Sequence, residues 1–599
     1  MKRIVSILAF LLPFVAFADN VSSDQARKVA ETFFSSHATR AVTPTLNLKW
    51  TGGVQTRTSS DPAFYVFDNS AGGFVIVAGD DRVEPILGYS TEGEFKVDGM
   101  PANVQYWFDY LQEGIAYLRT NRIVPSAKVK AQWKAFDNGT ASRISAAASV
   151  AKDLETADWN QYEPFNLKAS EWCNFGSGVT VYTGCVATAT AIIMRHHKYP
   201  SKGTGTIGGY SYTSEKKDNR TINAYSLGHT YDWNNMPTDN GRNWTTDQQN
   251  AVAQLMLDCG VMNEMEYGIY QPAEKNESGS GAVTGKSPKA LVEHMGYDKG
   301  WEALDRVYYQ RDEWVSRIIA SIDAGCPVLF SGRGTGGHAF VLDGYDSDGK
   351  IQINWGWGGY ENGYYTVPDF GNYTNDQTAY VNIKPDKGGS EIPTYIYQSG
   401  MRFSAGPTYT SDNTVEMKIF TARVGNGGGS LFEGKIVLAH ADKEDNIKSV
   451  ITTISQSLKS GSYFYDLEIP ITVNQNKIAK GDKIKWFYQH EGSDVYLPAK
   501  YNLEDGSTDG LPMPDTEDTF DIEEGTSAEY FPVEKKLVIS SHAGLKYVLK
   551  NSEGSTVDSG LAFSNGVLTI DLKTLASGKY TLMLMVGDKS KELIFTVGE

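Results

Sequence analysis

Residues 183–190 read TGCVATAT, so that one cysteine, Cys185, stands between a glycine and a run of small, mainly apolar residues. Apolar residues recur at helical spacing from this point, which predicts a helix over residues 186–198 that enters a core. A cysteine at the start of a helix lies at the positive end of the helix dipole, and this favours the reactive thiolate. A free cysteine in a protein is more often a small buried apolar residue than a nucleophile. Other parts of the chain must therefore decide between these two interpretations of Cys185.

A candidate base lies well downstream, where residues 336–341 read GGHAFV. His338 opens an apolar run typical of a buried strand, and the two glycines before it allow close approach of backbone and substrate. A Cys–His pair in contact can exist as thiolate and imidazolium, and the imidazolium can protonate a leaving amine. Asn354 ends the next apolar stretch, and we expect its amide to orient the imidazole. Together with Cys185 these residues form the minimum set of a thiol peptidase.

Oxyanion donors and a screen against water complete the expected site. The backbone N–H of Cys185 is one donor, and Gln161, upstream of the cysteine, carries a side-chain amide that by itself would be unremarkable. Asn354 leads into the sequence NWGWGG, and an indole of Trp355 or Trp357 over the catalytic pair would exclude water. We also expect Trp357 to be a substrate-binding residue, and for it a place in an ordinary wall or core is an equal alternative. No Cys or His pattern suggests zinc, and we expect neither metal nor cofactor.

The composition is that of a globular protein without a nucleic-acid or membrane partner. With 599 residues the chain is expected to hold roughly three or four domains. The net charge of −17, from 55 basic and 72 acidic residues, disfavours nucleic acid and anionic membranes. The four cysteines, Cys173, Cys185, Cys259 and Cys326, are too few for a disulfide scaffold, and a nucleophilic Cys185 would leave at least one other unpaired. We expect Cys259 and Cys326 to be buried thiols.

The N-terminal part is typical of an exported precursor. Residues 1–18 combine a basic start, an apolar run and the ending AFA, which predicts a signal peptide cleaved near Ala18 and a secreted, cell-surface or periplasmic location. The apolar run is too short to span a membrane, and we expect no integral membrane protein. Residues 19–144 have the pattern of an α+β subdomain. Its expected helices cover residues 26–35 and 104–118, and its expected strands cover residues 74–78 and 85–89.

A stretch rich in Ala, Ser and Gly, residues 136–150, separates this subdomain from the expected site. Small, polar and poorly structured segments are easily cut by proteases. We therefore expect a mature chain that begins between about Ser142 and Lys152, and a peptidase domain over residues 145–386.

Two all-β modules are expected after the peptidase domain. A Gly-rich linker ends near residue 392, and short alternating apolar runs then predict a β-sandwich over residues 393–503. Residues 504–529 are expected to be an acidic linker, since residues 504–524 carry nine Asp or Glu and no Lys or Arg. Residues 530–599 alternate again, which predicts a small all-β module whose role in sorting, adhesion or spacing is open.

These motifs, taken together, resemble the streptopain family of secreted bacterial cysteine peptidases. The matching segments are WNQ at 159–161, TGCVATATA at 183–191, YDWNNMP at 231–237, GHAFV at 337–341 and NWGWGG at 354–359. Residues 267–268 (YG) and 278–280 (SGS) resemble the two halves of a substrate-binding loop of that family, with extra residues between them in this chain. The resemblance covers roughly residues 20–386 and includes the pro-domain pattern GFVIV followed by ILGYS.

The resemblance implies a papain-like α+β peptidase domain, preceded by an inhibitory α+β pro-domain and followed by two all-β, sandwich-like modules. It implies Cys185 as nucleophile, His338 as general base and Gln161 as oxyanion donor, with Ser280 and Gly337 in contact with substrate. The family is often treated as a Cys–His dyad, so the resemblance itself assigns Asn354 no fixed role. It further implies protein or peptide substrates with a hydrophobic side chain next to the scissile residue, and the chain's own pro-domain as intramolecular inhibitor.

The leading hypothesis is a secreted, self-activating cysteine endopeptidase. One alternative is a non-enzymatic adhesion or binding protein that keeps a papain-like domain; loss of Cys185, His338 or Gln161 would favour it, but all three are present. Another alternative is a thiol acyltransferase such as a transglutaminase, which would use the same Cys–His pair. The family-like pro-domain favours the peptidase.

Overall fold

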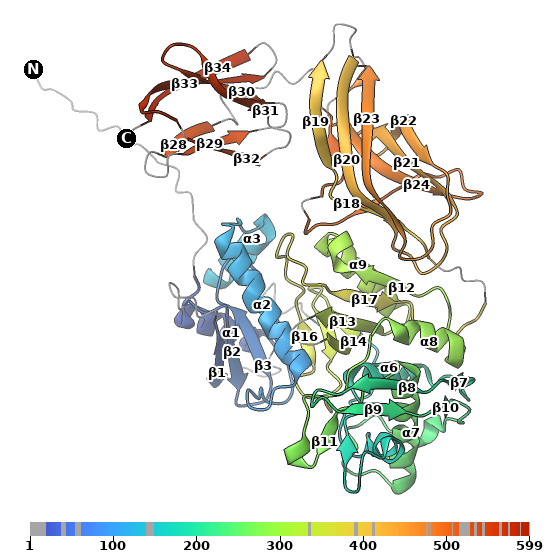
Figure 1. Ribbon diagram of the computed structural model, residues 1–599. Coiled ribbons are helices and arrows are strands. Elements are labelled where there is room, and N and C mark those ends of the chain that lie inside the picture. The colour runs from blue at the N-terminus through green and yellow to red at the C-terminus, as the bar shows by residue number, and fades with distance from the viewer. Residues whose placement is uncertain are drawn as a thin grey trace, which may run out of the picture. The chain divides into compact units, whose positions relative to one another are not determined.

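The computed structural model describes residues 20–37, 44–53, 61–138, 149–333, 337–388, 393–409, 414–474, 477–479, 481–505, 507–513, 527–531, 536–541, 545–561, 566–572, 575–586 and 589–597. Contacts divide the chain into two compact units, Met1–Glu391 and Ile392–Glu599 (Figure 1). The signal peptide expected over residues 1–18 lies outside the described residues, as do residues 139–148 of the stretch in which cleavage is expected. None of the helices within the described ranges is long and apolar enough to cross a membrane.

An antiparallel sheet with packed helices forms the N-terminal part of the first unit. Its elements are α1 (Ser23–His37), β1 (Leu46–Gly52), β2 (Phe64–Asn69), β3 (Phe74–Ala78), β4 (Ile86–Ser90), α2 (Ala102–Thr120) and α3 (Ala127–Asp137). β2 and β3 are almost wholly buried, because the runs FYVF and FVIVA leave neither face of these strands polar. The strand expected over residues 74–78 is β3 and the helix expected over residues 104–118 is α2, while α3 is an additional helix.

Helices and further strands make up the rest of the first unit. The helices are α5 (Leu167–Cys173), α6 (Cys185–His197), α7 (Thr246–Met262), α8 (Lys286–Met295) and α9 (Arg311–Asp323), with short 3₁₀ helices η1 (Trp233–Asn235), η2 (Ala273–Lys275) and η3 (Arg306–Tyr308). The strands are β5 (Val150–Asp153), β6 (Thr180–Val181), β7 (Thr206–Ile207), β8 (Tyr210–Thr213), β9 (Asn219–Ile222), β10 (Tyr225–Ser226), β11 (Ile269–Gln271), β12 (Glu302–Asp305), β13 (Val328–Arg333), β14 (Gly337–Asp346), β15 (Ile351–Asn354), β16 (Gly363–Tyr365) and β17 (Thr378–Val381). The helix expected over residues 186–198 corresponds to α6.

One eleven-stranded sheet joins the two parts of this unit, in the order β1-β2-β3-β4-β16-β15-β14-β13-β17-β12, with β5 paired to β14. β4 pairs antiparallel with β16 through Tyr89↔Tyr364 and Gly88↔Tyr365. Gly88 permits this contact, because a Cβ there would lie 2.6 Å from the Tyr365 ring. The Tyr89 hydroxyl also donates a hydrogen bond of 3.0 Å to Asp346 at the end of β14. The N-terminal part therefore extends the sheet of the part that carries the expected site.

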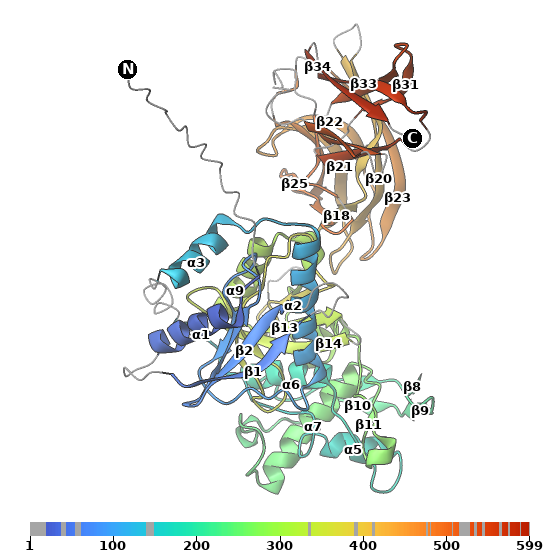
Figure 2. The same ribbon diagram turned by 90° about the vertical axis from the view of Figure 1, so that its left-hand side faces the viewer.

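Successive side chains of β13 and β14 point alternately into two hydrophobic cores, one on each face of the sheet. Phe330 and Phe340 face the core shared with the N-terminal part, with their rings stacked at 4.5 Å. Leu329 and Val341 face the other core, which α6 and α7 fill. Side chains two residues apart on a strand share a face, so His338 lies on the same side as Phe340. Helix α2 packs against β14, and Figure 2 draws the helix beside β13 and β14.

Strands build the second unit as two modules. The first module contains β18 (Ile396–Ser399), β19 (Arg402–Tyr409), β20 (Thr414–Asn426), β21 (Gly434–Ala441), β22 (Ile447–Ile454), β23 (Tyr463–Asn474), β24 (Lys483–His490), β25 (Leu497–Pro498), β26 (Lys500–Tyr501) and β27 (Leu511–Pro512). These strands form two five-stranded sheets that share one core. The second module contains β28 (Ser527–Phe531), β29 (Lys536–Ser541), β30 (Lys546–Asn551), β31 (Thr556–Leu561), β32 (Gly566–Asp571), β33 (Gly578–Val586) and β34 (Lys589–Val597), in sheets of three and four strands with a core of their own.

The acidic linker expected over residues 504–529 is shorter than predicted at both ends. β27 pairs with β24, and Leu511 belongs to the core of the first module. Asp509 forms ion pairs of 3.0 Å with Lys483 and 2.5 Å with Lys485 of β24. At the far end β28 already pairs with β29. Ion pairing and apolar burial thus offset the charge repulsion on which the linker prediction rested.

Candidate functional site

Cys185 is the first residue of α6, and the segment from β6 fixes its position. Gly184, with φ of 90°, turns the chain into the helix, and a Cβ there would lie 2.6 Å from Met265 Sδ. The Cys185 thiol is partly buried and lies beside Ala339 of β14, whose side chain belongs to the same hydrophobic core. Burial raises the pKa of the thiol, and the N–H groups of Ala339, Val186 and Cys185 itself oppose this shift.

His338 neighbours this contact, but its ring faces the N-terminal part of the unit. The imidazole lies 5.6 Å, between ring centroids, from Tyr106 of α2. Tyr106 also covers Gly332, the partner of His338 in β13, where a Cβ would lie 2.3 Å from the Tyr106 ring. Burial lowers the pKa of His338 to about 4. No hydrogen bond joins the imidazole to Cys185 Sγ among the described residues. The structure therefore brings the two segments together without pairing their side chains.

Gln161 presents a buried donor without a partner. Its side chain is 3% exposed, and Nε2 makes no hydrogen bond. The backbone carbonyl of Gln161 accepts from the N–H of Thr183 at 3.2 Å, which ties this segment to the approach to Cys185. The fully buried Trp159 anchors the segment by donating from Nε1 to Pro237 O at 2.8 Å. An unsatisfied buried donor costs about 1–3 kcal/mol, and an oxyanion is a partner that would remove this cost.

Asn354 does not orient His338, contrary to the expectation. Its Nδ2 donates to Thr156 Oγ1 at 2.9 Å and to Ala157 O at 3.0 Å, and its Oδ1 accepts from Gly356 N at 3.0 Å. These bonds occupy the amide on both sides. Asn354 thus ties the end of β15 to residues 156 and 157, which lead into Trp159 and Gln161.

Trp355 does not cover the Cys–His pair either. It is fully buried in the core shared with the N-terminal part, 4.7 Å from the Phe340 ring and 5.4 Å from the Tyr365 ring. Its Nε1 donates to Glu361 O at 3.0 Å. None of the ring contacts among the described residues joins it to His338. Trp355 follows the last residue of β15 and packs in the core that contains Phe340, whereas Cys185 packs against the other core.

Trp357 lies partly exposed at the edge of the same segment. Its Nε1 donates to Asn103 Oδ1 of α2 at 2.8 Å, and Asn103 Nδ2 donates to Trp355 O at 2.7 Å. The Trp357 ring lies 5.4 Å from that of Tyr162, the residue after Gln161. The structure therefore favours a wall position for Trp357, one of the two alternatives that the sequence left open.

Ser280 and Gly337, expected to contact substrate, have different surroundings. Ser280 is buried; its Oγ donates to Tyr182 O at 2.8 Å and accepts from Gly268 N at 2.9 Å. Both capacities of the hydroxyl therefore stabilise the approach to Cys185 rather than face outward. Gly337 begins β14, where its backbone pairs with that of Arg333.

The remaining cysteines form no disulfide. All four are free thiols, with Cys259 and Cys326 buried and Cys173 partly buried. The expectation of buried thiols at Cys259 and Cys326 is confirmed. Within the described ranges, no group of three or more His, Cys, Asp or Glu side chains is placed to hold a metal ion.

Two residues of α2, Asn103 and Tyr106, are the parts of this site that sequence reasoning missed. Asn103 is 2% exposed at the start of the helix, where an asparagine usually caps a helix or faces solvent. Tyr106 fits the apolar face of an amphipathic helix, and nothing in the local sequence indicates that it packs against a histidine. Their partners lie far along the chain, so only the folded sheet reveals them.

Comparisons with known proteins match both parts of the first unit. Residues 159–365 match the family model "Peptidase C10 family", and residues 18–115 match the model "Spi protease inhibitor". The second match spans the N-terminal sheet and most of α2. The two models thus separate the part that carries Cys185 and His338 from the part that carries Asn103 and Tyr106.

Relatives give the same assignment. Streptopain of Streptococcus pyogenes is 32% identical over 347 residues, which is 54% of this chain and 80% of streptopain. The thiol protease/hemagglutinin PrtT of Porphyromonas gingivalis is 29% identical over 419 residues, which is 66% of this chain and 45% of that protein. Among solved structures, a prointerpain A fragment of Prevotella intermedia is 27% identical with a TM-score of 0.44, and the match covers 57% of this chain and 99% of the fragment. The chain therefore belongs to the peptidase C10, or streptopain, family: it is a cysteine peptidase with a papain-like fold and an inhibitor-like pro-domain.

Proposed function

We propose that this chain is a secreted, self-activating cysteine endopeptidase in which Cys185 is the nucleophile and His338 the general base. The observation that carries the proposal is the packing of α6 on β14, which puts Cys185, at the start of α6, beside Ala339, the residue after His338. The unpartnered Nε2 of Gln161 supports its role as an oxyanion donor. Asn354 acts in this scheme as a positioning residue for the segment that carries Gln161.

The proposed reaction has two half-reactions. His338 accepts the thiol proton, and the Cys185 thiolate attacks the scissile carbonyl carbon. The carbonyl oxygen takes the negative charge and accepts hydrogen bonds from the Cys185 N–H and Gln161 Nε2. The imidazolium then protonates the leaving amine, which leaves a thioester on Cys185. Water, deprotonated by His338, attacks the thioester and releases the acid and the free thiol.

The pro-domain is proposed to keep this pair inactive. Tyr106 against the His338 ring, and Asn103 between Trp355 and Trp357, support an inhibitory role for α2. The shifts of the two pKa values have the matching sign: a raised thiol pKa and a lowered imidazole pKa both favour the uncharged pair at neutral pH. Departure of α2 would free the His338 ring to turn about its χ1 angle toward Cys185.

We expect the alkylation rate of Cys185 to report this change. In the full-length chain the rate with iodoacetamide should be low at pH 7 and rise about tenfold per pH unit toward alkaline pH, because only the thiolate reacts. In the processed enzyme the rate should already be near its plateau at pH 7, on the order of 10²-fold faster, because His338 stabilises the thiolate. Mass spectrometry of the peptide that contains Cys185 measures both rates. Equal rates at pH 7 in the two forms would contradict an inhibitory role for the pro-domain.

The domain division is also a proposal: signal peptide to residue 18, pro-domain to 144, peptidase domain to 386, then two β modules of which the first extends to residue 513. Pairing of β5 with β14 argues that processing falls before Ser149, because residues 150–153 are held in the sheet. Secretion rests on the N-terminal pattern of the sequence. The β modules are proposed to serve sorting or adhesion.

A chain that stops near Pro385 is expected to fold and to cleave short peptides with kcat/KM within about threefold of the full chain. The reason is that the first unit has two hydrophobic cores of its own. This is checked by measuring peptide hydrolysis with matched preparations of the two chains. Fractionation of the producing cells then shows in which fraction each chain is found. Loss of hydrolysis in a soluble, folded truncated chain would place the β modules in the catalytic unit instead.

Hydrolysis of denatured protein at neutral pH with a reductant separates the proposed function from its alternatives. An endopeptidase produces new N-termini inside the substrate. A thiol acyltransferase would instead incorporate a primary amine, and an adhesion protein would do neither. Protein substrates with an apolar side chain near the scissile bond are the proposed substrate class.

A further inference from the structure

Four aromatic side chains meet beside Gln161, and the mechanism above uses none of them to hold substrate. The Tyr162 ring lies 4.7 Å from Tyr270, 5.4 Å from Trp357 and 5.8 Å from Tyr182, and Tyr182 lies 5.1 Å from Tyr270. We call these four residues the aromatic cluster. They come from four segments: the one that carries Gln161, the approach to Cys185, β11, and the turn after Asn354. The cluster thus connects every segment that carries a proposed catalytic side chain except the start of β14.

The aromatic cluster is not a closed core. Tyr162, Tyr270 and Trp357 are each partly exposed, whereas Tyr182 is 7% exposed. The hydroxyl groups of Tyr162 and Tyr270 make no hydrogen bond with another described residue and are not among the buried unpaired polar atoms, so they reach solvent. Flat, partly exposed tyrosine and tryptophan rings bind apolar side chains well, because they offer a large contact area at low conformational cost.

The pro-domain occupies one side of the aromatic cluster. Trp357 Nε1 donates to Asn103 Oδ1 of α2. When the pro-domain leaves, this N–H loses its partner and becomes available to a peptide carbonyl, while the Trp357 ring becomes more exposed. The cluster therefore changes from a pro-domain contact into a surface next to the proposed oxyanion donor.

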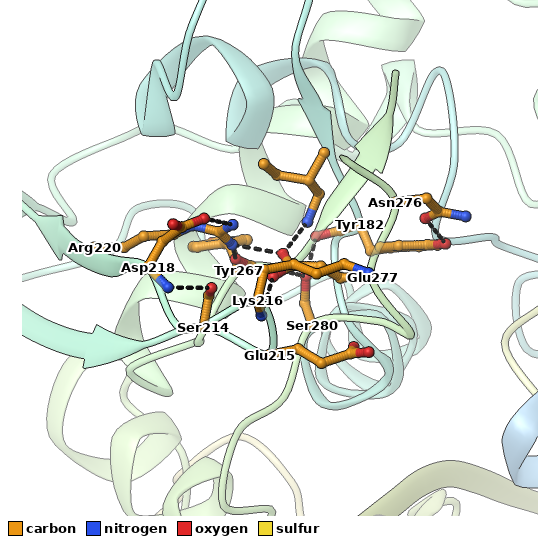
Figure 3. Close-up of polar contacts among 12 residues, drawn as sticks. Tyr182, Ser214, Glu215, Lys216, Asp218, Arg220, Tyr267, Asn276, Glu277 and Ser280 are labelled. Atoms are coloured by element: carbon orange, nitrogen blue, oxygen red, sulfur yellow. Dashed lines mark hydrogen bonds and ion pairs between the residues drawn. The ribbon is translucent and has the colours of Figure 1, made fainter. Parts of the chain in front are cut away.

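A buried ion pair holds the strand that carries Tyr270. The Glu277 carboxylate accepts hydrogen bonds from Arg220 Nη1 at 2.6 Å, from Ile269 N at 2.8 Å and from Lys216 N at 3.2 Å (Figure 3). Burial would raise the pKa of Glu277, but the hydrogen bonds from Arg220 and the two N–H groups lower it overall, so the carboxylate is charged. Arg220 Nη1 also donates to Tyr267 O at 2.9 Å.

A second set of contacts ties this strand to the approach to Cys185. β11 pairs with β6 through Ile269↔Val181. The Tyr182 hydroxyl donates to Asn276 Oδ1 at 2.9 Å, and Ser280 Oγ donates to Tyr182 O at 2.8 Å (Figure 3). Tyr270 is therefore a fixed wall, held on one side by Glu277 and on the other by the segment that leads to the nucleophile.

We infer that the aromatic cluster is a specificity subsite that binds an aliphatic or aromatic side chain of the peptide substrate, with Tyr270 as its central wall and the Arg220–Glu277 pair as its positioning brace. The inference rests on the proposed function. Trp357 was already expected to bind substrate, whereas Tyr162, Tyr182 and Tyr270 were not, and none of the four is Ser280 or Gly337. The substrate side chain packs against the rings of Tyr162, Tyr270 and Trp357, and its peptide group takes the hydrogen bond that Trp357 gives to Asn103 in the precursor.

The test compares cleavage of matched peptides that carry either Phe or Gly at each of three positions on either side of the scissile bond. The enzyme is the full chain after self-processing, as wild type and with Tyr270→Ala or Tyr270→Phe. In wild type, Phe should be preferred over Gly at one of these positions. Tyr270→Ala should reduce that preference, measured as a ratio of kcat/KM values, by roughly tenfold or more, as expected for loss of an apolar contact. Tyr270→Phe keeps the ring and should keep the preference.

Further variants separate this subsite from a general structural role. Tyr465→Ala removes a 71% exposed tyrosine of β23 and is the matched control, with no expected change. Glu277→Gln should weaken the preference in the same direction without changing which position shows it. If Tyr270→Ala fails to fold, Tyr270→Val, which suits a strand, carries the same comparison. An unchanged Phe/Gly ratio at every position in a folded, active Tyr270 variant overturns the inference. A wild type that cleaves no peptide at all, or a Cys185→Ala variant that cleaves as well, would instead overturn the proposed function.

Discussion

Replacing Cys185 or His338 by alanine is expected to abolish proteolysis, with losses of at least about 10⁴-fold in kcat, because the two side chains act as one unit. Without the thiol no thioester can form, and without the imidazole neither the thiol nor the leaving amine exchanges its proton. The assay is reductant-dependent hydrolysis of a denatured protein and of a short peptide by each variant after its pro-domain has been removed by an added protease.

Matched controls make this result interpretable. Cys173 is a partly buried free thiol of α5, and Cys173→Ala is expected to leave kcat within about twofold. Gln161→Ala should retain activity but lose on the order of 10²–10³ in kcat with little change in KM, as for other oxyanion donors. Substantial hydrolysis by Cys185→Ala would show that Cys185 is not the nucleophile.

Loss of the α2 contacts is the second large effect that we expect. The double variant Asn103→Ala, Tyr106→Ala removes two hydrogen bonds to the Trp355 and Trp357 segment and the ring over His338. The bond to Trp355 is buried and the bond to Trp357 partly buried, and together they contribute about 3 kcal/mol, since each loss removes a hydrogen bond from the partner that remains. We therefore expect the unprocessed double variant to hydrolyse a small peptide on the order of 10²-fold faster than unprocessed wild type, measured immediately after reductant is added.

Gln105→Ala is the matched control for α2. Gln105 Nε2 bonds to Asp109 of its own helix at 2.8 Å, so its loss should leave latency unchanged. If the double variant were as inactive as wild type before processing, α2 would be a folding aid and not an inhibitor.

Local patterns in the sequence predicted the elements that carry the site. The helix at Cys185 and the strand at His338 follow from apolar periodicity within about a dozen residues, which is the range over which such patterns are informative. The position of Gln161 near the nucleophile followed only from the family resemblance. The hydrogen bond from Thr183 N to Gln161 O now gives a physical reason for it.

Contacts set by strand register could not be predicted in the same way. Asn354 ends β15 and bonds to Thr156, whereas Trp355, the next residue, packs on Phe340. A motif gives the order of such residues but not the face that each one takes. The sequence therefore did not show that the Asn354 amide bonds to residues 156, 157 and 356, or that Trp355 packs in the core away from Cys185.

Charge patterns misled for a related reason. The acidic stretch after residue 503 was predicted as a linker because its own residues repel each other. Lys483 and Lys485 of β24, more than 20 residues away, neutralise Asp509 and allow Leu511 to be buried. A prediction from local charge cannot include such distant partners. The buried Arg220–Glu277 ion pair could not be predicted for the same reason, since in the sequence both residues look like ordinary surface charges.

N-terminal sequencing of the purified full-length chain after incubation with reductant tests the central claim most directly, with wild type beside Cys185→Ala. Self-activation predicts that wild type acquires a new N-terminus in the stretch between about Ser142 and Ser149, while Cys185→Ala keeps its original one. The wild-type conversion should also stop when iodoacetamide is added first. Conversion of Cys185→Ala at the same bond and the same rate in a pure preparation would contradict the account, because the cut would then need no thiolate at Cys185.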